Sequence, residues 1–161
     1  IDAADWFANE VFPRIRNMHD EVKFLIVGQS PTRQVLNLAK RPGITVTGSV
    51  DDIRPYIAAA TVCVVPLRMG GGTRFKILEA MALSKPVVST TIGAEGFPVT
   101  DGKEILIADN PQDLVRAIDS LLCQKDNRVL LGKAGRTFVS NNYRWKAIMP
   151  IVEKLYNRTI I

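Results

Sequence analysis

The segment best suited to do chemistry is a glycine-rich stretch near the middle of the chain. Three consecutive glycines, Gly70, Gly71 and Gly72, follow a valine-rich run, and a helix is predicted to start at about Thr73. Glycines let the backbone approach a ligand closely and present successive N–H groups to it. The free N–H groups and the partial positive charge of a helix N-terminus extend such a site. This arrangement predicts an anion-binding loop.

The charges around the glycines favour the same interpretation. No acidic residue lies between Asp52 and Glu79, whereas Arg68, Arg74 and Lys76 all do. Arg74 and Lys76 fall in the first turn of the predicted helix, where the dipole favours acids by about 0.3–1 kcal/mol per charge. A bound anion would outweigh that penalty, because a charge-assisted hydrogen bond contributes about 1.5–3 kcal/mol. The alternative is a surface loop with solvated cations, in which Lys76 and Glu79 form an i,i+3 pair.

Motifs for other anion-binding functions are missing from the sequence. The first predicted strand is followed by VGQSP rather than G-x-G-x-x-G, and the chain contains no G-x-x-x-x-G-K-[ST]. A dinucleotide-binding fold and an NTPase are therefore disfavoured. No D-x-D pattern offers ligands for a metal-bound diphosphate, and no zinc or RNP pattern indicates nucleic acid as a partner. The net charge of +5 favours anionic partners without choosing among them.

The potential metal and redox ligands carry little signal in the sequence. Cys63 and Cys123 lie in apolar segments, and we interpret both as small core residues of a reduced protein. His19 has no cysteine, histidine or carboxylate at ligand spacing, so we expect it at the surface. The sequence therefore predicts no metal site.

Short apolar runs alternate with helical stretches along the 161 residues. The predicted strands are 23–28, 44–48, 61–66, 86–90 and 104–108, and four of these runs are continuous, as expected for a parallel sheet covered on both faces. The predicted helices are 31–40, 52–59, 74–84, 111–123 and 126–140, with one more at each end. Ser30 before Pro31 is expected to cap the first internal helix. We predict a single α/β domain, a Rossmann-like doubly wound parallel sheet flanked by helices.

Both terminal helices carry a large apolar face. The first face comprises Trp6, Phe7, Val11, Phe12, Ile15 and Met18, with Pro13 expected to kink the helix. The last face comprises Tyr143, Trp145, Ile148, Ile151, Val152 and Tyr156. Each face is expected to pack on the domain's own sheet, and the alternative is contact with a partner domain outside this sequence.

The run PLRMGGGTRFKILEAMALSKPVVST, with FLIVGQSP before it and YRWKAIMPIVEKLY at the end, resembles the group-one retaining glycosyltransferases of the GT-B fold. The resemblance covers almost the whole chain and corresponds to the C-terminal, donor-binding half of that family. It implies a UDP- or GDP-linked sugar as substrate, no other cofactor, and a cleft that faces an N-terminal acceptor domain outside this sequence.

The resemblance also implies roles for particular residues. The implied catalytic residues are Lys76, Arg68 and Glu79, and the implied donor-binding residues are Gly70, Gly71, Gly72, Thr73, Arg74, Ser49, Val50 and Asp51. Lys76, the loop amides and Arg68 or Arg74 would hold the diphosphate, and Glu79 would bind the ribose. Residues 49–51 would contact the base, and Gly93–Gly96 would shape the far wall.

Two departures from the family pattern affect these expectations. The family's Glu-x7-Glu has Gly71 in place of its first glutamate, which leaves the donor sugar open. The chain also starts at the helix that follows the first strand of the family's C-terminal half. By the resemblance that strand is central, so we expect oligomerisation, or another segment in the gap. The chain alone is expected to be inactive.

The expected function is transfer of a sugar from a nucleoside diphosphate to a glycan or lipid-linked acceptor. Retention of configuration is implied by the resemblance, and metal independence by cations and N–H groups that would stabilise the leaving phosphate. The alternatives are a GT-B-type sugar-nucleotide epimerase and a non-catalytic nucleotide-binding module. No signal or membrane span is visible, so we expect a cytoplasmic protein, with peripheral contact to an acidic membrane left open.

Overall fold

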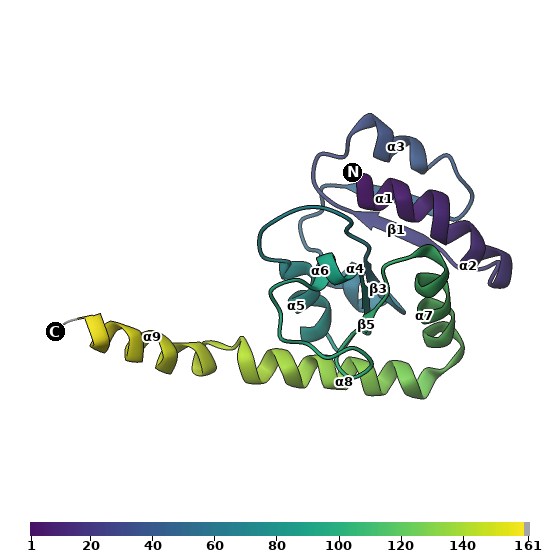
Figure 1. Ribbon diagram of the computed structural model, residues 1–161. Helices are drawn as coiled ribbons and strands as arrows, with labels where there is room; N and C mark the ends of the chain where they lie inside the picture. Colours follow the sequence, from purple (N-terminus) through teal and green to yellow (C-terminus); the bar gives the residue numbers. More distant parts are fainter. Residues whose placement is uncertain (160–161) are drawn as a thin grey trace.

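The computed structural model describes residues 1–159, except for the side chains at positions 151, 155, 158 and 159. The strands are β1 (Phe24–Val27), β2 (Ile44–Gly48), β3 (Cys63–Val65), β4 (Val87–Ser89) and β5 (Leu106–Ile107). The helices are α1 (Asp2–Trp6), the π-helix η1 (Phe7–Val11), α2 (Phe12–Met18), α3 (Arg33–Leu38), α4 (Arg54–Ala59), α5 (Phe75–Ala82), α6 (Thr91–Ala94), α7 (Pro111–Cys123), α8 (Lys125–Asn142) and α9 (Trp145–Thr159). Figure 1 shows their arrangement. Each strand lies within a predicted run, so the alternation of strands and helices is confirmed.

The strands form two parallel sheets rather than one. β1 pairs with β2, and β3, β4 and β5 pair in that order. No ladder joins β1 to β3 within the described residues. The α/β class with parallel strands is therefore confirmed, and the sheet is divided between β1 and β3.

Helices cover both faces of the β3–β5 sheet. Val64 and Val88 belong to a core formed with η1, α2 and α7, whereas their neighbours Val65 and Val87 belong to a second core formed with α5 and α8. Alternate strand residues point to opposite faces of a sheet, so these cores lie on opposite sides. The first core also includes Ile44 of β2, so one set of helices packs over both sheets.

The N-terminal helices pack onto the domain as expected. Phe7 and Phe12 are buried, and their ring centroids lie 4.7 and 5.6 Å from that of Phe24 in β1. The predicted disturbance at Pro13 takes the form of the π-helix η1, which ends two residues earlier at Val11. Proline has no N–H, and its ring crowds the carbonyl four residues before it, so a wider turn here relieves both conflicts.

The predicted cap of α3 is wrong. The helix starts at Arg33, and the hydroxyl of Thr32 accepts from the N–H of Val35 at 3.5 Å. Ser30 instead has a φ of 48°, in the left-handed region. The threonine two positions later can therefore cap the helix while Ser30 forms part of the preceding turn.

The last helix departs from the expected packing. Tyr143 does pack on the domain, with its ring 5.8 Å from Phe97 and 5.7 Å from Phe138. The following helix α9 extends away from the body (Figure 1), and Trp145 and Tyr156 are 77% and 67% exposed. The side chain of Ile151, also assigned to this face, lies outside the described residues. In the described part of the chain, no helix combines the length and the apolar character that a membrane span requires.

Candidate functional site

The glycine-rich segment forms the loop between β3 and α5, and hydrogen bonds fix the first part of this loop to the start of α6. The hydroxyl of Thr90 donates to the carbonyl of Leu67. The N–H of Thr90 and the hydroxyl of Ser89 both donate to the carbonyl oxygen of Val65, at 3.3 and 3.2 Å. The loops that follow β3 and β4 are thus joined at the carboxyl edge of the sheet, where open α/β folds bind their ligands.

The loop after β5 joins the same network. The carboxylate of Asp109 accepts from the N–H and from the hydroxyl of Thr91, both at 2.7 Å. Neither Thr90 nor Thr91 is among the site residues predicted from the sequence. Their position directly after a buried strand was the signal that could have identified them.

Arg74 folds back on the glycine loop instead of facing solvent. Its side chain is buried, and its guanidinium donates to the carbonyls of Gly71 at 2.5 Å, Gly70 at 2.7 Å and Gly72. The helix starts one residue later, at Phe75, with Arg74 as its N-cap. The guanidinium therefore determines the shape of the loop.

The backbone N–H groups of the loop are left available. From Gly70 through Lys76 they donate to no acceptor within residues 1–159. Gly70 and Gly72 have φ values of 128° and 87°, which only glycine adopts readily. Gly71 has an ordinary φ, and a Cβ there would meet no atom within 4 Å. The fold itself therefore does not require glycine at position 71.

Lys76 and Glu79 lie one turn apart on α5 and are both exposed. The i,i+3 ion pair considered as the alternative does not form, and neither side chain has another ion-pair partner among the described residues. Lys76 therefore remains available for an anion at the N-terminus of α5.

Arg68 is engaged by the N-terminal helix. Its guanidinium is paired with the carboxylate of Asp2, where Nε lies 3.1 Å from Oδ2, and it stacks over Trp6 at 5.0 Å from the ring centroid. The hydrogen bond to Asp2 raises the pKa of Arg68 and lowers that of Asp2. Arg68 and Lys76 therefore have different surroundings. Arg68 contacts two residues of α1, whereas Lys76 faces solvent.

The predicted base-contacting residues follow β2, in the other sheet. Ser49 and Asp51 are exposed and form no hydrogen bond to the glycine loop among the described residues. The next residue, Asp52, accepts from the N–H of Arg54 at 2.9 Å and stabilises the start of α4. Their role in binding a base stays a prediction.

The segment Gly93–Gly96 lies in and after α6. A Cβ on Gly93 would lie 2.5 Å from the carbonyl oxygen of Val65 and 2.3 Å from the hydroxyl of Ser89. This glycine is therefore required for close packing of α6 against the end of β3. Its contribution to a ligand pocket stays a prediction.

A cavity of about 280 Å³ lies near the carboxyl ends of β1 and β2. Ile26 and Val46 of these strands line it, with Gly28 and Ser30 after β1 and with Ile1 and Ala4 at the N-terminus. Neither Lys76 nor Glu79 lines this cavity. This cavity is therefore separate from the two charged side chains of α5.

The structure corrects the interpretation of Cys123 and of His19 and agrees with that of Cys63. Cys123 is exposed rather than part of the core. Cys63 packs against the core beside α5, as expected, and burial raises the pKa of its thiol to about 11. His19 is not a free surface residue, because its ring contacts Asp119 at 2.7 Å. The two residues are 100 positions apart, so no local spacing could have revealed the contact.

Comparison with known proteins identifies the family. Residues 1–124 match the family model described as "Glycosyl transferases group 1". A GDP-mannose-dependent alpha-(1-6)-phosphatidylinositol monomannoside mannosyltransferase of Mycobacterium tuberculosis is 31% identical over 151 residues, which cover 84% of this chain and 39% of that protein. The chain belongs to the group 1 glycosyltransferase family.

Solved structures agree on the fold. The C-terminal domain of a group 1 glycosyl transferase from Francisella tularensis superimposes with a TM-score of 0.71 at 17% identity, covering 88% of this chain and 77% of that domain. Anabaena HepE, in complex with UDP and glucose, gives 0.75 at 18% identity, covering 91% of this chain and 43% of that protein. These matches show a GT-B-type fold, and the Francisella structure is itself a C-terminal domain. The chain spans less than half the length of the curated relative and of HepE.

Proposed function

We propose that this chain is the donor-binding half of a glycosyltransferase that moves a sugar from a nucleoside diphosphate to a glycan or lipid-linked acceptor. The observation that carries the proposal is the run of unpartnered N–H groups from Gly70 through Lys76, next to an exposed ammonium at the start of α5. Backbone N–H groups at a helix N-terminus, together with a cation, form an anion site. Two similar proteins, the GDP-mannose-dependent mannosyltransferase and the HepE structure in complex with UDP, support a nucleotide-linked donor.

In this proposal the loop binds the diphosphate and stabilises it as a leaving group. Negative charge builds on the phosphate as the bond to the sugar breaks, and fixed donors aimed at that charge lower the barrier. Lys76 supplies the mobile cation, and Arg74 acts as a positioning residue, because its guanidinium is already bound to the loop carbonyls. Glu79, one turn along the same face of α5, would accept hydrogen bonds from the ribose hydroxyls.

The first test is calorimetric titration of the chain with UDP and with GDP. Lys76→Ala should weaken binding between about tenfold and a hundredfold, as expected for one lost charge-assisted hydrogen bond. Lys125→Ala is the matched control, because Lys125 is also an exposed lysine in the first turn of a helix, α8. Equal effects of both substitutions, or no binding of either nucleotide at millimolar concentration, would contradict the proposal.

We further propose that the transfer needs no metal ion. Lys76 and the N–H groups would supply the positive charge that a divalent cation supplies to diphosphates elsewhere. Nucleotide affinity should therefore be the same in excess EDTA. Loss of binding in EDTA, with recovery on adding Mg²⁺ or Mn²⁺, would refute metal independence.

Gly71 tests whether the nucleotide approaches the loop closely. Gly71→Ala should leave the free energy of unfolding within about 0.5 kcal/mol of the wild type, because its Cβ would meet no protein atom. The same methyl group would stand where a bound diphosphate contacts the backbone, so nucleotide affinity should fall. Unchanged affinity in this variant would exclude close approach at this position.

The acceptor site is proposed to lie on a second domain. Trp145, Met149, Val152 and Tyr156 form an exposed stripe on α9, which follows α8 and extends away from the body (Figure 1). A helix with one apolar stripe normally buries it. We infer that α9 packs on the acceptor domain, and that the chain alone binds nucleotide without transferring sugar.

The division between the two sheets supports one further element of this proposal. In the doubly wound order 3-2-1-4-5-6, the arrangement β2-β1 followed by β3-β4-β5 has position 1 open. A strand from outside residues 1–161 is proposed to pair with both β1 and β3. The chain without it should self-associate through these edges in light scattering, and a monomer at every concentration tested would argue against an open position.

A further inference from the structure

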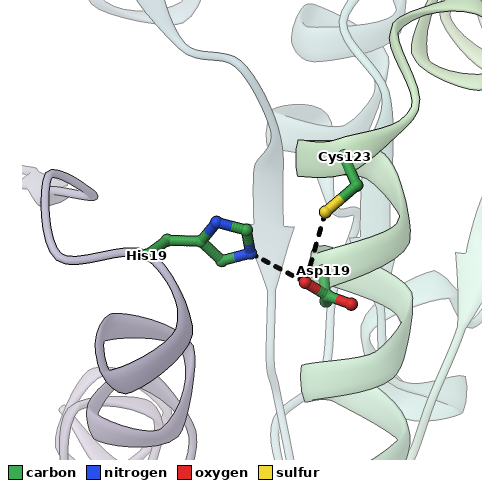
Figure 2. Close-up of side chains that lie close together, drawn as sticks. All are labelled: His19, Asp119 and Cys123. Atoms are coloured by element: carbon green, nitrogen blue, oxygen red, sulfur yellow. Dashed lines mark hydrogen bonds and ion pairs between the residues drawn. The ribbon is translucent and has the colours of Figure 1, made fainter.

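Three potential metal ligands from distant parts of the sequence meet beside helix α7 (Figure 2). His19 follows the end of α2, and Asp119 and Cys123 lie one turn apart on α7. Oδ1 of Asp119 is 2.7 Å from Nε2 of His19 and 3.5 Å from Sγ of Cys123. The three ligand atoms all lie within 4.8 Å of one another.

The order of the three groups argues against an activated nucleophile. Nucleophilic cysteines need a base or a cation next to the thiol. Here the carboxylate of Asp119 lies between the thiol and the imidazole, and both contacts are made to the same oxygen atom. The three side chains instead combine ligand types that a metal ion binds.

We propose that His19, Asp119 and Cys123 form a binding site for a borderline transition-metal ion of the Zn²⁺ class. Imidazole and thiolate favour such ions over Mg²⁺ or Ca²⁺, which take oxygen ligands. Three protein ligands leave a fourth tetrahedral position for water. The site uses no residue of the β3–α5 loop and is therefore separate from the proposed nucleotide site.

The distances between the ligand atoms fit a tetrahedral metal ion after small movements of the side chains. Bond lengths of about 2.0–2.3 Å imply ligand atoms about 3.3–3.6 Å apart. The distance from Asp119 to Cys123 is already 3.5 Å, and that from His19 to Asp119 must widen from 2.7 Å. The side chains of His19 and Asp119 are 26% and 38% exposed, and Cys123 is exposed, so an ion can enter and the ligands can adjust.

A bound ion would join two elements that already pack together. Buried residues of α2, such as Phe12 and Ile15, share one core with Leu114 and Ile118 of α7. His19 immediately follows α2, so coordination would add a cross-link at the edge of this interface. Ions that bind only the folded state raise its stability by mass action.

The test is a titration of the full chain with Co²⁺, which reports thiolate ligation through a near-ultraviolet charge-transfer band. We expect a band at one equivalent, and its displacement by Zn²⁺. Cys123→Ser should abolish the band. Cys63→Ala is the matched control and should retain it, because Cys63 lies in β3 outside the cluster. A wild type without the band, or a band that depends on Cys63, would overturn the proposal.

Two further variants separate a built site from a lone thiolate. His19→Gln and Asp119→Asn should each weaken Zn²⁺ at least about tenfold in competition with a chelating dye. Affinity unchanged in both variants would show that Cys123 acts alone, and this outcome would also overturn the site. Thermal unfolding provides a second readout: Zn²⁺ should raise the midpoint of the wild type, and of His19→Gln by less. Nucleotide affinity in EDTA tests the proposed function separately, so either proposal can fail without the other.

Discussion

The guanidinium of Arg74 is buried and donates to the carbonyl groups of Gly70, Gly71 and Gly72. A lysine at this position could carry the same charge, but its ammonium lacks the planar fork that reaches several carbonyls at once. The β3–α5 loop therefore depends on the shape of this side chain as well as on its charge.

Arg74→Lys should lower the free energy of unfolding by about 2 kcal/mol, the scale of a lost hydrogen bond to a charged group. Urea unfolding gives the measurement. Arg116→Lys is the control, because Arg116 is an exposed arginine whose ion pair with Asp113 contributes little. If the two substitutions have equal effects, Arg74 does not stabilise the loop.

The contrast between Arg74 and Lys76 shows the limit of local reasoning at the scale of residues. From the sequence, both Arg74 and Lys76 were expected to hold the diphosphate, because both cations lie near the start of the same helix. In the structure Arg74 turns inward to the loop carbonyls, and Lys76 turns to solvent. Charge is a property of the residue, whereas the direction of a side chain depends on which acceptors the folded loop presents.

At the scale of elements, the packing of α8 against α5 holds in place the helix that carries Lys76 and Glu79. A Cβ on Gly132 of α8 would lie 2.1 Å from the carbonyl oxygen of Ser84, which follows α5. Ser84 has a φ of 56°, so this turn is already constrained. The backbone of α8 can approach α5 this closely only because Gly132 has no side chain.

Gly132→Ala should therefore destabilise the protein by about 1–3 kcal/mol, as overpacking does. The sign is informative, because alanine inside an unconstrained helix would instead stabilise by about 1 kcal/mol relative to glycine. Denaturant unfolding measures the change. Gly28→Ala is the control, since a Cβ there would meet nothing within 4 Å, and a stabilised Gly132→Ala would contradict the close approach.

The elements themselves were largely predictable. Short Val- and Ile-rich runs are typical of strands in a parallel sheet. All five observed strands lie within the ranges predicted from these runs. The π-helix η1 and the cap at Thr32 were missed, because each depends on how one turn of backbone fits its neighbours. The packing of α9 was also missed, since an apolar face does not specify its partner.

At the scale of the whole molecule, the fold stabilises the ionised form of several carboxyl groups. Burial alone would raise the pKa of Glu104, but the N–H of Thr100 and the ammonium of Lys103 outweigh it, and the pKa is lowered. Side-chain hydrogen bonds also lower the pKa values of Asp2 and Asp113. A lowered pKa in the folded state means that the unfolded state binds protons more readily.

Stability should consequently fall on the acid side. The contribution of Glu104 is fully present above its unfolded pKa of about 4.3 and is lost as the pH falls through the lower folded value. Glu104→Gln should be less stable than the wild type at pH 7 and should lose less stability on acidification. Urea unfolding at a series of pH values measures this, with exposed Glu21→Gln as the control. Parallel pH profiles for the wild type and Glu104→Gln would contradict the assignment.

The sequence by itself determined the α/β class, the order of strands and helices, and the place of the glycine-rich loop between a strand and a helix, because these follow from periodicity and from residue types that are close in the chain. Only the tertiary structure decided that Arg68 pairs with Asp2, that the sheet divides between β1 and β3, and that His19 meets Asp119 and Cys123. Such contacts join residues far apart in sequence. They depend on how the cores bring helices and sheets together, which no local pattern encodes.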